Sequence, residues 1–324
     1  MHIWLKRTAV FAFAAGMLVY VHCALAQQYP ARPIRIVAAS SPGSGPDVVA
    51  RLIAQKLTER LGQQVVVDNR AGVGGNLGAE AVARAAPDGY TLLLAMASQA
   101  IGMTLYKKLS YDLARDFAAI APVASTPFIL TTHLSLPATS VKGLIALAKA
   151  RPGELLLGSG GAGTPPHLCA EMFKAHARIS FVHVPYKGIT PALTDVQSGQ
   201  LHFAFSSVPA AMPFVRSARL RALAVTTLQR SALVPDVPSV AETLPGFEAV
   251  GWYGLVAPAG TPQAVIERLH AVTQSAVGVP GLIEQLRNQG AEPMQGTSAS
   301  FGAFIGAEIK KWGDAVKDVE AGPE

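Results

Sequence analysis

The sequence predicts an α/β protein with parallel sheets covered by helices, built as more than one domain. Short apolar, β-branched runs alternate with helical patterns along most of the 324 residues, as expected for parallel strands joined by crossover helices. Half of the residues are hydrophobic and 15% are charged, which suits large buried cores. A chain of this length usually forms several cores rather than one.

Residues 1–26 are predicted to be a secretory signal peptide. Lys6 and Arg7 form a charged start, residues 8–21 are mostly apolar, and residues 24–26 (Ala-Leu-Ala) form a small-x-small cleavage site. A retained membrane anchor is the alternative, but the apolar run is near the lower length limit for a spanning helix. We therefore expect export, with cleavage after Ala26.

Charge and cysteine content exclude several classes of function. The net charge of +6 falls to +4 without Lys6 and Arg7, and the basic residues are scattered along helices rather than clustered. Nucleic-acid binding is therefore not expected. Of two cysteines only Cys169 remains after cleavage, so no intramolecular disulfide is possible, and a lone cysteine on an apolar helix is usually a core residue.

The N-terminal part contains successive strand-to-helix units. Apolar residues recur at helical spacing from Val48 to Leu61, and Gly62 ends that run. Residues 72–76 (Gly-Val-Gly-Gly-Asn) lead into an alanine-rich helix. The expected elements are a strand at 34–39, a helix opening at Asp47, a strand at 64–68, a helix at 79–86, a strand at 91–95 and then a loop containing Ser98 and Gln99.

From Val123 the alternation starts again, which indicates an inserted block with its own core. The expected elements are helices at 140–150, 191–198 and 208–216 and strands at 155–157, 181–184, 201–205 and 219–226, followed by a proline-rich return path at 233–246, a strand at 251–257 and helices at 262–277, 280–290 and 298–319. This order predicts a discontinuous first lobe, 27–125 plus 230–324, and an inserted second lobe, 126–229.

Two glycine-rich strand-to-helix turns are the most informative local feature. The first covers residues 40–46 before Asp47, and the second covers residues 158–164 before Pro165. Such turns can aim unpaired N–H groups and a positive helix end at an anion. A plain tight turn is the alternative for either segment alone, but two turns facing one cleft would grip a carboxylate or phosphate from both sides. Neither turn matches a dinucleotide or phosphate loop.

Side chains beside the turns are further candidates. Asp47 and His167 lie close to helix starts, and Tyr186 and Lys187 lie at a strand end, where open α/β sheets bind ligands. Each has a structural alternative, since Asp47 suits the helix dipole, His167 could cap and pack, and Lys187 could be solvated. The sequence has no G-x-S-x-G elbow and no histidine spacing typical of a metal site. We therefore expect no catalytic residue, no metal and no cofactor.

Motifs along the whole mature chain resemble the substrate-binding proteins of tripartite tricarboxylate transporters, the Bug family. The motifs are Tyr29-Pro30-x-Arg32-Pro33-Ile34-Arg35-Ile36-Val37, Pro42-Gly43-x-Gly45-x-Asp47, Val67-Asp68-Asn69-Arg70-Ala71-Gly72-x-Gly74-Gly75-Asn76, Ala86-Pro87-Asp88-Gly89-Tyr90-Thr91, Gly161-x-Gly163-Thr164-Pro165-x-His167-Leu168, Val184-Pro185-Tyr186-Lys187-Gly188, Leu220-Arg221-Ala222-Leu223-Ala224-Val225 and Trp252-Tyr253-Gly254-Leu255-x-Ala257-Pro258-Ala259-Gly260-Thr261-Pro262.

The resemblance implies a two-domain periplasmic-binding-protein fold, type II-like, with hinged lobes and a ligand cleft between them. It implies a periplasmic monomer that captures a small carboxylate by lobe closure and hands it to integral-membrane transporter subunits. The ligand-binding residues expected from the turns and the resemblance together are Ser40, Ser41, Pro42, Gly43, Ser44, Asp47, Ser98, Gln99, Ser159, Gly161, Ala162, Gly163, Thr164, His167, Tyr186 and Ser206.

Departures from the family pattern bear on specificity. The chain has Ala39-Ser40 in place of a proline and an aromatic, Ala162 in place of a common asparagine, Ser206 in place of a frequent aspartate, and Gly102-Met103 in place of Asn-Pro. A roomier, less negative pocket predicts a ligand that is larger or more negatively charged than a small amino acid. A receptor that signals to a membrane kinase is the main alternative function, and an enzyme on the same scaffold is another.

Overall fold

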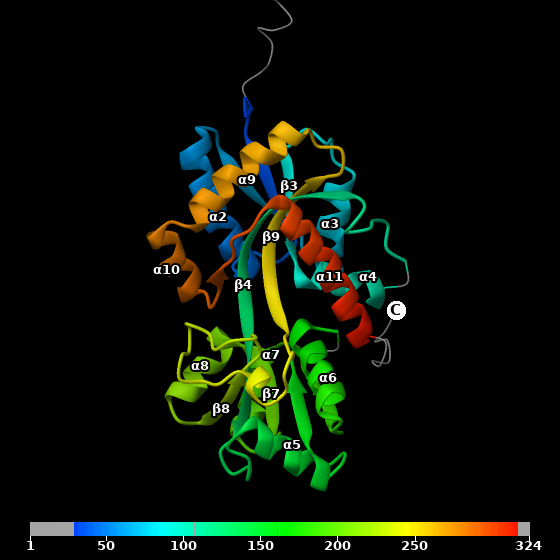
Figure 1. The fold of residues 1–324 in the computed structure, drawn as a ribbon, viewed down its shortest axis with the longest axis vertical. Coiled ribbons are helices and arrows are strands. Elements are labelled where there is room, and N and C mark those ends of the chain that lie inside the picture. Colours follow the sequence, from blue (N-terminus) through cyan, green and yellow to red (C-terminus); the bar gives the residue numbers. More distant parts are fainter. Residues whose placement is uncertain (1–28, 107, 162, 317–324) are drawn as a thin grey trace, which may run out of the picture.

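The computed structural model describes residues 29–106, 108–161 and 163–316 (Figure 1). The expected signal peptide and its cleavage site lie outside the described residues. The elements in chain order are β1 (Ile34–Ala38), α2 (Gly45–Leu61), β2 (Val65–Asn69), the 3₁₀ turn η1 (Val73–Gly75), α3 (Asn76–Ala83), β3 (Thr91–Met96), α4 (Ala97–Leu105), β4 (Phe117–His133), α5 (Val141–Ala150), β5 (Leu156–Ser159), α6 (Pro165–Ala177), β6 (Val182–Pro185), α7 (Ile189–Gln197), β7 (Phe203–Ser207), α8 (Val208–Arg216), β8 (Leu220–Val225), η2 (Val240–Glu242), β9 (Val250–Pro258), α9 (Gln263–Val277), α10 (Pro280–Asn288), β10 (Glu292–Pro293) and α11 (Ser298–Val316).

The described strands form one sheet with the order β2-β1-β3-β9-β4-β7-β5-β6, and β8 and β10 also pair with β4. The expectation of parallel strands is confirmed for β1 to β3 and for β5 to β7. It is wrong for β4, β8, β9 and β10, which pair antiparallel. The cause lies in β4 and β9, which carry the chain between the two halves of the sheet in opposite directions.

The 17-residue strand β4 belongs to both halves of the molecule. From Phe117 to Pro127 it pairs with β9, and from Phe128 onward it pairs with β7 and β8. We call the half with β1, β2, β3, β9 and β10 lobe 1, and the half with β5, β6, β7 and β8 lobe 2. Figure 1 shows β4 and β9 running between them. Val123, where the sequence pattern begins again, therefore lies inside β4 and not at its start. The expected domain boundaries at 125/126 and 229/230 stay a prediction.

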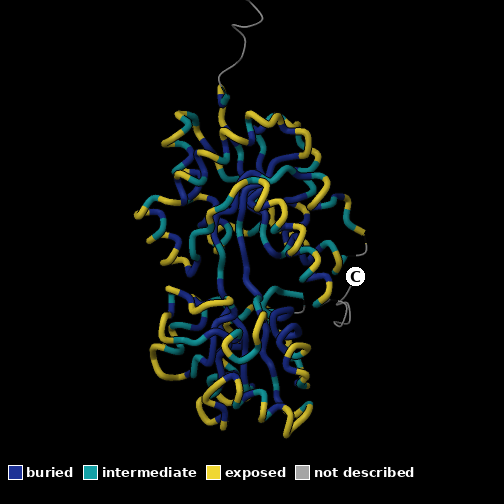
Figure 2. Tube along the Cα trace, viewed as in Figure 1, coloured by how far each residue is buried: buried dark blue, intermediate teal, exposed yellow. Residues whose placement is uncertain are grey.

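Helices cover both faces of each lobe, and the strands between them are the most buried part of the chain (Figure 2). In lobe 1, α2, α9 and α10 share one apolar cluster with the sheet, while α3, α4 and α11 pack in another. In lobe 2, α5 and α6 belong to the same cluster as α3, α4 and α11, and α7 and α8 cover the other face. Among the described residues, none of the helices has the length and apolar character needed to span a bilayer.

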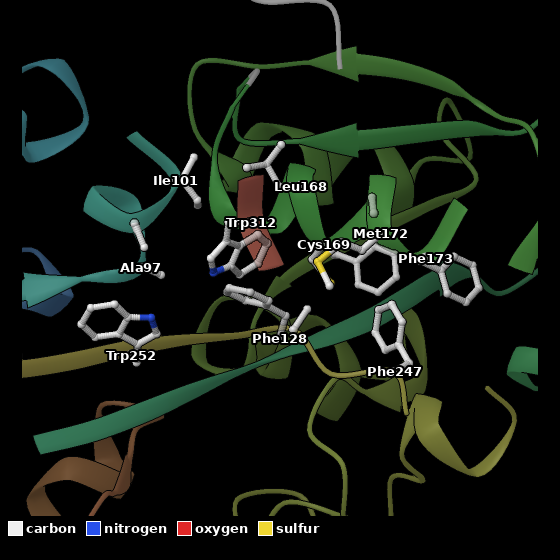
Figure 3. Packing of buried hydrophobic residues seen from close by; sticks show 14 of the residues in the cluster. Ala97, Ile101, Phe128, Leu168, Cys169, Met172, Phe173, Phe247, Trp252 and Trp312 are labelled. Atoms are coloured by element: carbon white, nitrogen blue, oxygen red, sulfur yellow. The ribbon is translucent and has the colours of Figure 1, made fainter. Parts of the chain in front are cut away.

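One apolar core is continuous across the two lobes (Figure 3). Ile101 of α4 and Trp252 of β9 come from lobe 1, while Leu168 and Cys169 come from α6 in lobe 2, and all four are buried. Burial raises the pKa of the Cys169 thiol well above its usual value, consistent with the core role that the sequence predicts for it.

Most of the predicted elements are present, and the clearest error is at Ser98 and Gln99. A loop is expected there, but the structure has helix α4 directly after β3. The Gln99 side chain accepts a hydrogen bond from the Met96 N–H (2.7 Å) and so helps to satisfy the first turn of this helix.

Candidate functional site

The carboxyl ends of the parallel strands in both lobes point toward the same stretch of β4. The last residue of β3, Met96, pairs with Tyr253 of β9, and Tyr253 pairs with Ala124 of β4. In lobe 2 the last residue of β7, Ser207, pairs with Phe128 of β4. Ala124 and Phe128 are about 13 Å apart along a strand. The loops after β1, β5 and β6 and the starts of α4 and α8, which directly follow β3 and β7, therefore lie on the lobe boundary, where ligands bind in open α/β sheets.

The first glycine-rich turn is closed by its own side chains. Gly43 has φ +77°, a left-handed conformation that favours glycine. Its N–H donates to Asp47 Oδ2 at 2.8 Å. The Ser44 hydroxyl donates to the Ser41 carbonyl at 2.7 Å, and the Ser44 N–H donates to the same carbonyl. Hydrogen bonds between its own residues thus hold the shape of the turn.

Asp47 anchors this turn from inside the protein. Its carboxylate is 2% exposed and lies 3.0 Å from Arg51 Nε and 2.9 Å from Asn69 Nδ2. Burial raises the pKa of the Asp47 carboxyl, but the hydrogen bonds from Arg51, Gly43 and Asn69 outweigh burial, so its pKa lies below the ordinary value. Asp47 is therefore ionised and its oxygens are already occupied.

The second glycine-rich turn repeats three hydrogen bonds of the first. Gly163 has φ +72°, and its N–H donates to His167 Nδ1 at 3.1 Å. The Thr164 hydroxyl donates to the Gly161 carbonyl at 2.8 Å, and the Thr164 N–H donates to the same carbonyl. His167 thus holds the position in α6 that Asp47 holds in α2. The two lobes carry the same turn with a carboxylate in one and an imidazole in the other.

These bonds correct the expectation that the turns present unpaired N–H groups. The N–H groups of Gly43, Ser44, Gly163 and Thr164 all have acceptors within their own turns. In addition, α6 begins with Pro165-Pro166, and proline has no N–H to offer. A ligand at these four amides must replace an internal acceptor.

The second turn lies on a buried cluster of polar side chains. The rings of His167 and His183 stack with centroids 3.8 Å apart, and Ser159 Oγ lies 2.6 Å from His183 Nε2. Glu171 Oε1 lies 3.9 Å from His167 Nε2 and its other oxygen pairs with Lys174 at 3.1 Å. His183 was not among the predicted site residues; the signal that could have found it is its place on the strand next to the turn.

Both histidine rings are neutral near pH 7. Burial, together with the positive charge of Lys174, lowers the pKa of His167 to about 4. Burial also lowers the pKa of His183 to about 4; the His167 ring adds to this effect, and Glu171 opposes it.

We expect the lowered pKa of His167 to make the protein less stable in acid. The unfolded state binds a proton at His167 below about pH 6.5, but the folded state does so only below about pH 4, so the free energy of unfolding falls as the pH drops through this window. The loss attributable to His167 is about 3 kcal/mol. Urea unfolding between pH 4 and pH 7 measures it. The variant His167→Gln should show a shallower dependence, and an equal slope in both proteins would contradict the assignment.

Three predicted site residues carry buried polar atoms with no partner among the described residues: Ser98 Oγ, Gln99 Nε2 and Ser206 Oγ. Two residues outside the prediction do the same, Asn76 Nδ2 and Thr132 Oγ1. A buried polar atom without a partner costs about 1–3 kcal/mol, so such atoms are usually satisfied by a ligand or an ordered water. Their spacing in the sequence gives no hint that they share this property.

The remaining predicted residues differ in their surroundings. Ser41 and Pro42 are exposed, Ser40 is half-buried, and Ala162 lies outside the described residues. The Tyr186 hydroxyl donates to Asp195 Oδ2 at 2.5 Å, which raises the pKa of Tyr186. That hydroxyl is therefore engaged within lobe 2.

Contacts across the boundary involve residues that the sequence analysis did not single out as site residues. A Cβ on Gly163 would lie 2.9 Å from Leu105 Cδ2, so α4 of lobe 1 touches the second turn. Within lobe 1, a Cβ on Gly45 would lie 3.7 Å from the hydroxyl of Tyr253. Burial raises the pKa of Tyr253 to about 12, although a hydrogen bond with the Thr126 side chain opposes this shift, so its hydroxyl is protonated and already has a partner in β4.

A family model described as the tripartite tricarboxylate transporter family receptor matches residues 49–321. The chain belongs to this family. Protein BugT of Bordetella pertussis (strain Tohama I) is 37% identical over 315 residues, covering 96% of each chain. The predicted recognition as a Bug-family protein is thereby confirmed.

Solved structures of similar proteins agree with this family. The R. palustris protein Rpa4515, solved with adipate, has a TM-score of 0.75 and 36% identity, covering 89% of this chain and 97% of that one. The periplasmic binding protein BugD has a TM-score of 0.73 and 30% identity, with 91% and 100% covered. MatC from Rhodopseudomonas palustris, with bound malate, has a TM-score of 0.72 and 29% identity, covering 89% of this chain and 100% of that one.

These tricarboxylate-transporter receptors are two-lobed periplasmic binding proteins, so the predicted fold class is confirmed. The family and the fold are those of substrate-binding receptors. Small carboxylates occupy the solved relatives named with ligands.

Proposed function

We propose that this chain captures a small carboxylate between its two glycine-rich turns and delivers it to the membrane subunits of a tripartite tricarboxylate-type transporter. One observation carries the proposal: the same turn occurs in both lobes, at carboxyl strand ends that point to one stretch of β4. Closure would bring the two turns together around the ligand, which then stabilises the closed state. The protein acts as a periplasmic monomer, cleaved after Ala26.

The predicted binding residues fit this role as a set. The unpartnered atoms of Ser98, Gln99 and Ser206 supply hydrogen-bonding capacity at the strand ends of both lobes. The turns of residues 40–47 and 159–167 supply N–H groups whose internal acceptors a carboxylate could replace. Ser206, where the family frequently has aspartate, favours an anionic ligand because no carboxylate stands at that position to repel it.

We also propose that the protein catalyses no reaction. The close contact of Ser159 Oγ with His183 Nε2 is the nearest approach to a nucleophile and base. However, Ser159 Oγ also accepts a hydrogen bond from the Gly161 N–H, and His183 stacks on another ring. Among the residues placed by the structure, no carboxylate hydrogen-bonds to His183 to orient it as a base. Turnover of any bound carboxylate by the purified protein would overturn this proposal.

Ligand identification tests the main proposal. Mass spectrometry of the protein exported from its own host should detect a co-purifying carboxylate. Calorimetric titration with mono-, di- and tricarboxylates, including adipate and malate, should give the highest affinity for a ligand with at least two negative charges. Preference for a cationic or zwitterionic amino acid would refute the inference drawn from Ser206.

A further inference from the structure

The two turns differ at one chemically decisive position. In the first turn the Gly43 N–H is held by the Asp47 carboxylate, and in the second the Gly163 N–H is held by His167 Nδ1. Asp47 is fixed as an anion by Arg51 and Asn69. A carboxylate ligand cannot convert it into a donor. His167 can change its role, because an imidazole nitrogen that accepts a hydrogen bond becomes a donor when it binds a proton.

We propose that the second turn takes up one proton from solvent as it binds a carboxylate, with His167 Nδ1 as the proton acceptor. This rests on the function proposed above. In the free protein Nδ1 accepts from Gly163, so the neutral ring carries its proton on Nε2. On binding, the Gly163 N–H turns to a carboxylate oxygen, and the new Nδ1–H donates to the same ligand group. An acceptor that competed with the ligand thus becomes a second donor to it.

The charged groups around His167 oppose one another, so that a ligand anion would decide whether its ring is charged. His167 Nε2 lies 3.9 Å from Glu171 Oε1, close enough for this carboxylate to attract the protonated ring. Lys174, which pairs with the other Glu171 oxygen, opposes that charge. On α11, which also packs against α6, Lys311 is paired with Glu308. Without a ligand the ring stays neutral at neutral pH, in line with its lowered pKa.

His183 limits the uptake to a single proton. Its ring stacks on that of His167 at 3.8 Å with an interplanar angle of 18°. Two positive rings at this separation would repel each other strongly in a buried site. His183 is therefore a positioning residue. Its ring stacks on that of His167 and contacts Ser159 at the start of the turn. It stays neutral when His167 is charged.

Proton uptake has a definite sign in binding. Because the ligand raises the pKa of His167, the affinity rises as the pH falls from the bound value toward the free value of about 4. The rise approaches tenfold per pH unit within that window. Below the free value no further gain is expected.

The first arm of the test needs no ligand. Nuclear magnetic resonance titration of the free protein should show the His167 ring titrating near pH 4. The Gly163 amide signal should move with the same midpoint, since its acceptor is lost on protonation. A Gly163 amide chemical shift that does not change as His167 titrates would overturn the proposal.

The second arm is calorimetry with adipate at about pH 6 in buffers of different ionisation enthalpy, which counts protons taken up on binding. The wild-type protein should take up about one proton more than the variant His167→Asn, whose amide oxygen can still accept from Gly163 but cannot titrate. Subtracting the variant removes any proton carried by adipate itself. Equal uptake in both proteins would overturn the proposal.

His202→Asn is the matched control. His202 Nδ1 also accepts a backbone N–H, that of Leu156 at 2.8 Å, and burial lowers its pKa too. It lies beyond the amino end of β7, away from the lobe boundary. Its variant should therefore retain the wild-type uptake, and a loss of uptake there would refute the assignment to His167. If adipate does not bind, the proposed function loses support, while the first arm still decides the role of His167.

Discussion

Replacing Glu308 by alanine is expected to lower the free energy of unfolding by about 4 kcal/mol, because two buried indole N–H groups lose their acceptor. Glu308 Oε2 accepts from Trp252 Nε1 at 3.0 Å and from Trp312 Nε1 at 2.8 Å. The carboxylate is 3% exposed and also pairs with Lys311. Urea unfolding followed by tryptophan fluorescence measures the loss. Once the signal is removed, Trp252 and Trp312 are the only tryptophans in the sequence.

Glu308→Gln is the control for this change. Its side-chain oxygen can still accept from an indole, while the charge that pairs with Lys311 is gone. We expect less than half the loss seen with alanine. An alanine variant within 1 kcal/mol of the wild-type protein, a margin of about one ordinary hydrogen bond, would show that the two indole bonds, including the one from Trp252 that joins α11 to β9, do not stabilise the fold.

Asp47→Ala is expected to reduce adipate affinity by about a hundredfold or more, because the first turn loses the group that fixes it. Gly43 would lose its acceptor, and Arg51 and Asn69 would lose a shared buried partner. Removing one member of such a network costs about 3 kcal/mol. The ligand would then have to reorder the turn as it binds. This cost of about 3 kcal/mol is subtracted from the free energy of binding, so the affinity falls by the corresponding factor. Calorimetric titration with adipate measures the change.

Asp47→Asn separates the acceptor from the charge. Asparagine keeps one oxygen for the Gly43 N–H, so we expect a loss of about tenfold. Circular dichroism must first show that both variants are folded. Unchanged affinity in a folded alanine variant would mean that the first turn does not bind the ligand.

Local patterns were sufficient to predict most elements of this fold. Gly62 adopts φ 67° at the end of α2, as the sequence predicts for a helix stop. The long strand β4 could not be predicted from the sequence, because Ala121, Pro122 and Ala124 do not mark a strand by composition. Its pairing with β9 and β7 decides its conformation, and such long-range pairing leaves no local signature.

The two glycine-rich turns were predictable in position and not in their hydrogen bonds. Glycine placement located both turns, and the positions of Asp47 and His167 close to helix starts, together with the family motifs, singled out these two side chains. Both side chains accept hydrogen bonds from the N–H groups of Gly43 and Gly163. These bonds depend on side-chain χ angles and on the left-handed φ of the two glycines, which composition does not encode. The role of His183 depends on how β6 lies beside β5, a tertiary fact.

The paired crossing of β4 and β9 limits which movements between the lobes are easy in the proposed closure. Pro127 and Val250, where the chain passes between lobes, are partners in one antiparallel ladder. Such a two-stranded ribbon flexes easily perpendicular to its plane, whereas sliding one strand along the other would break ladder hydrogen bonds. In the lobe closure proposed above, bending of this ribbon is therefore favoured over sliding, and the two lobes would keep the same lateral register in the open and closed states.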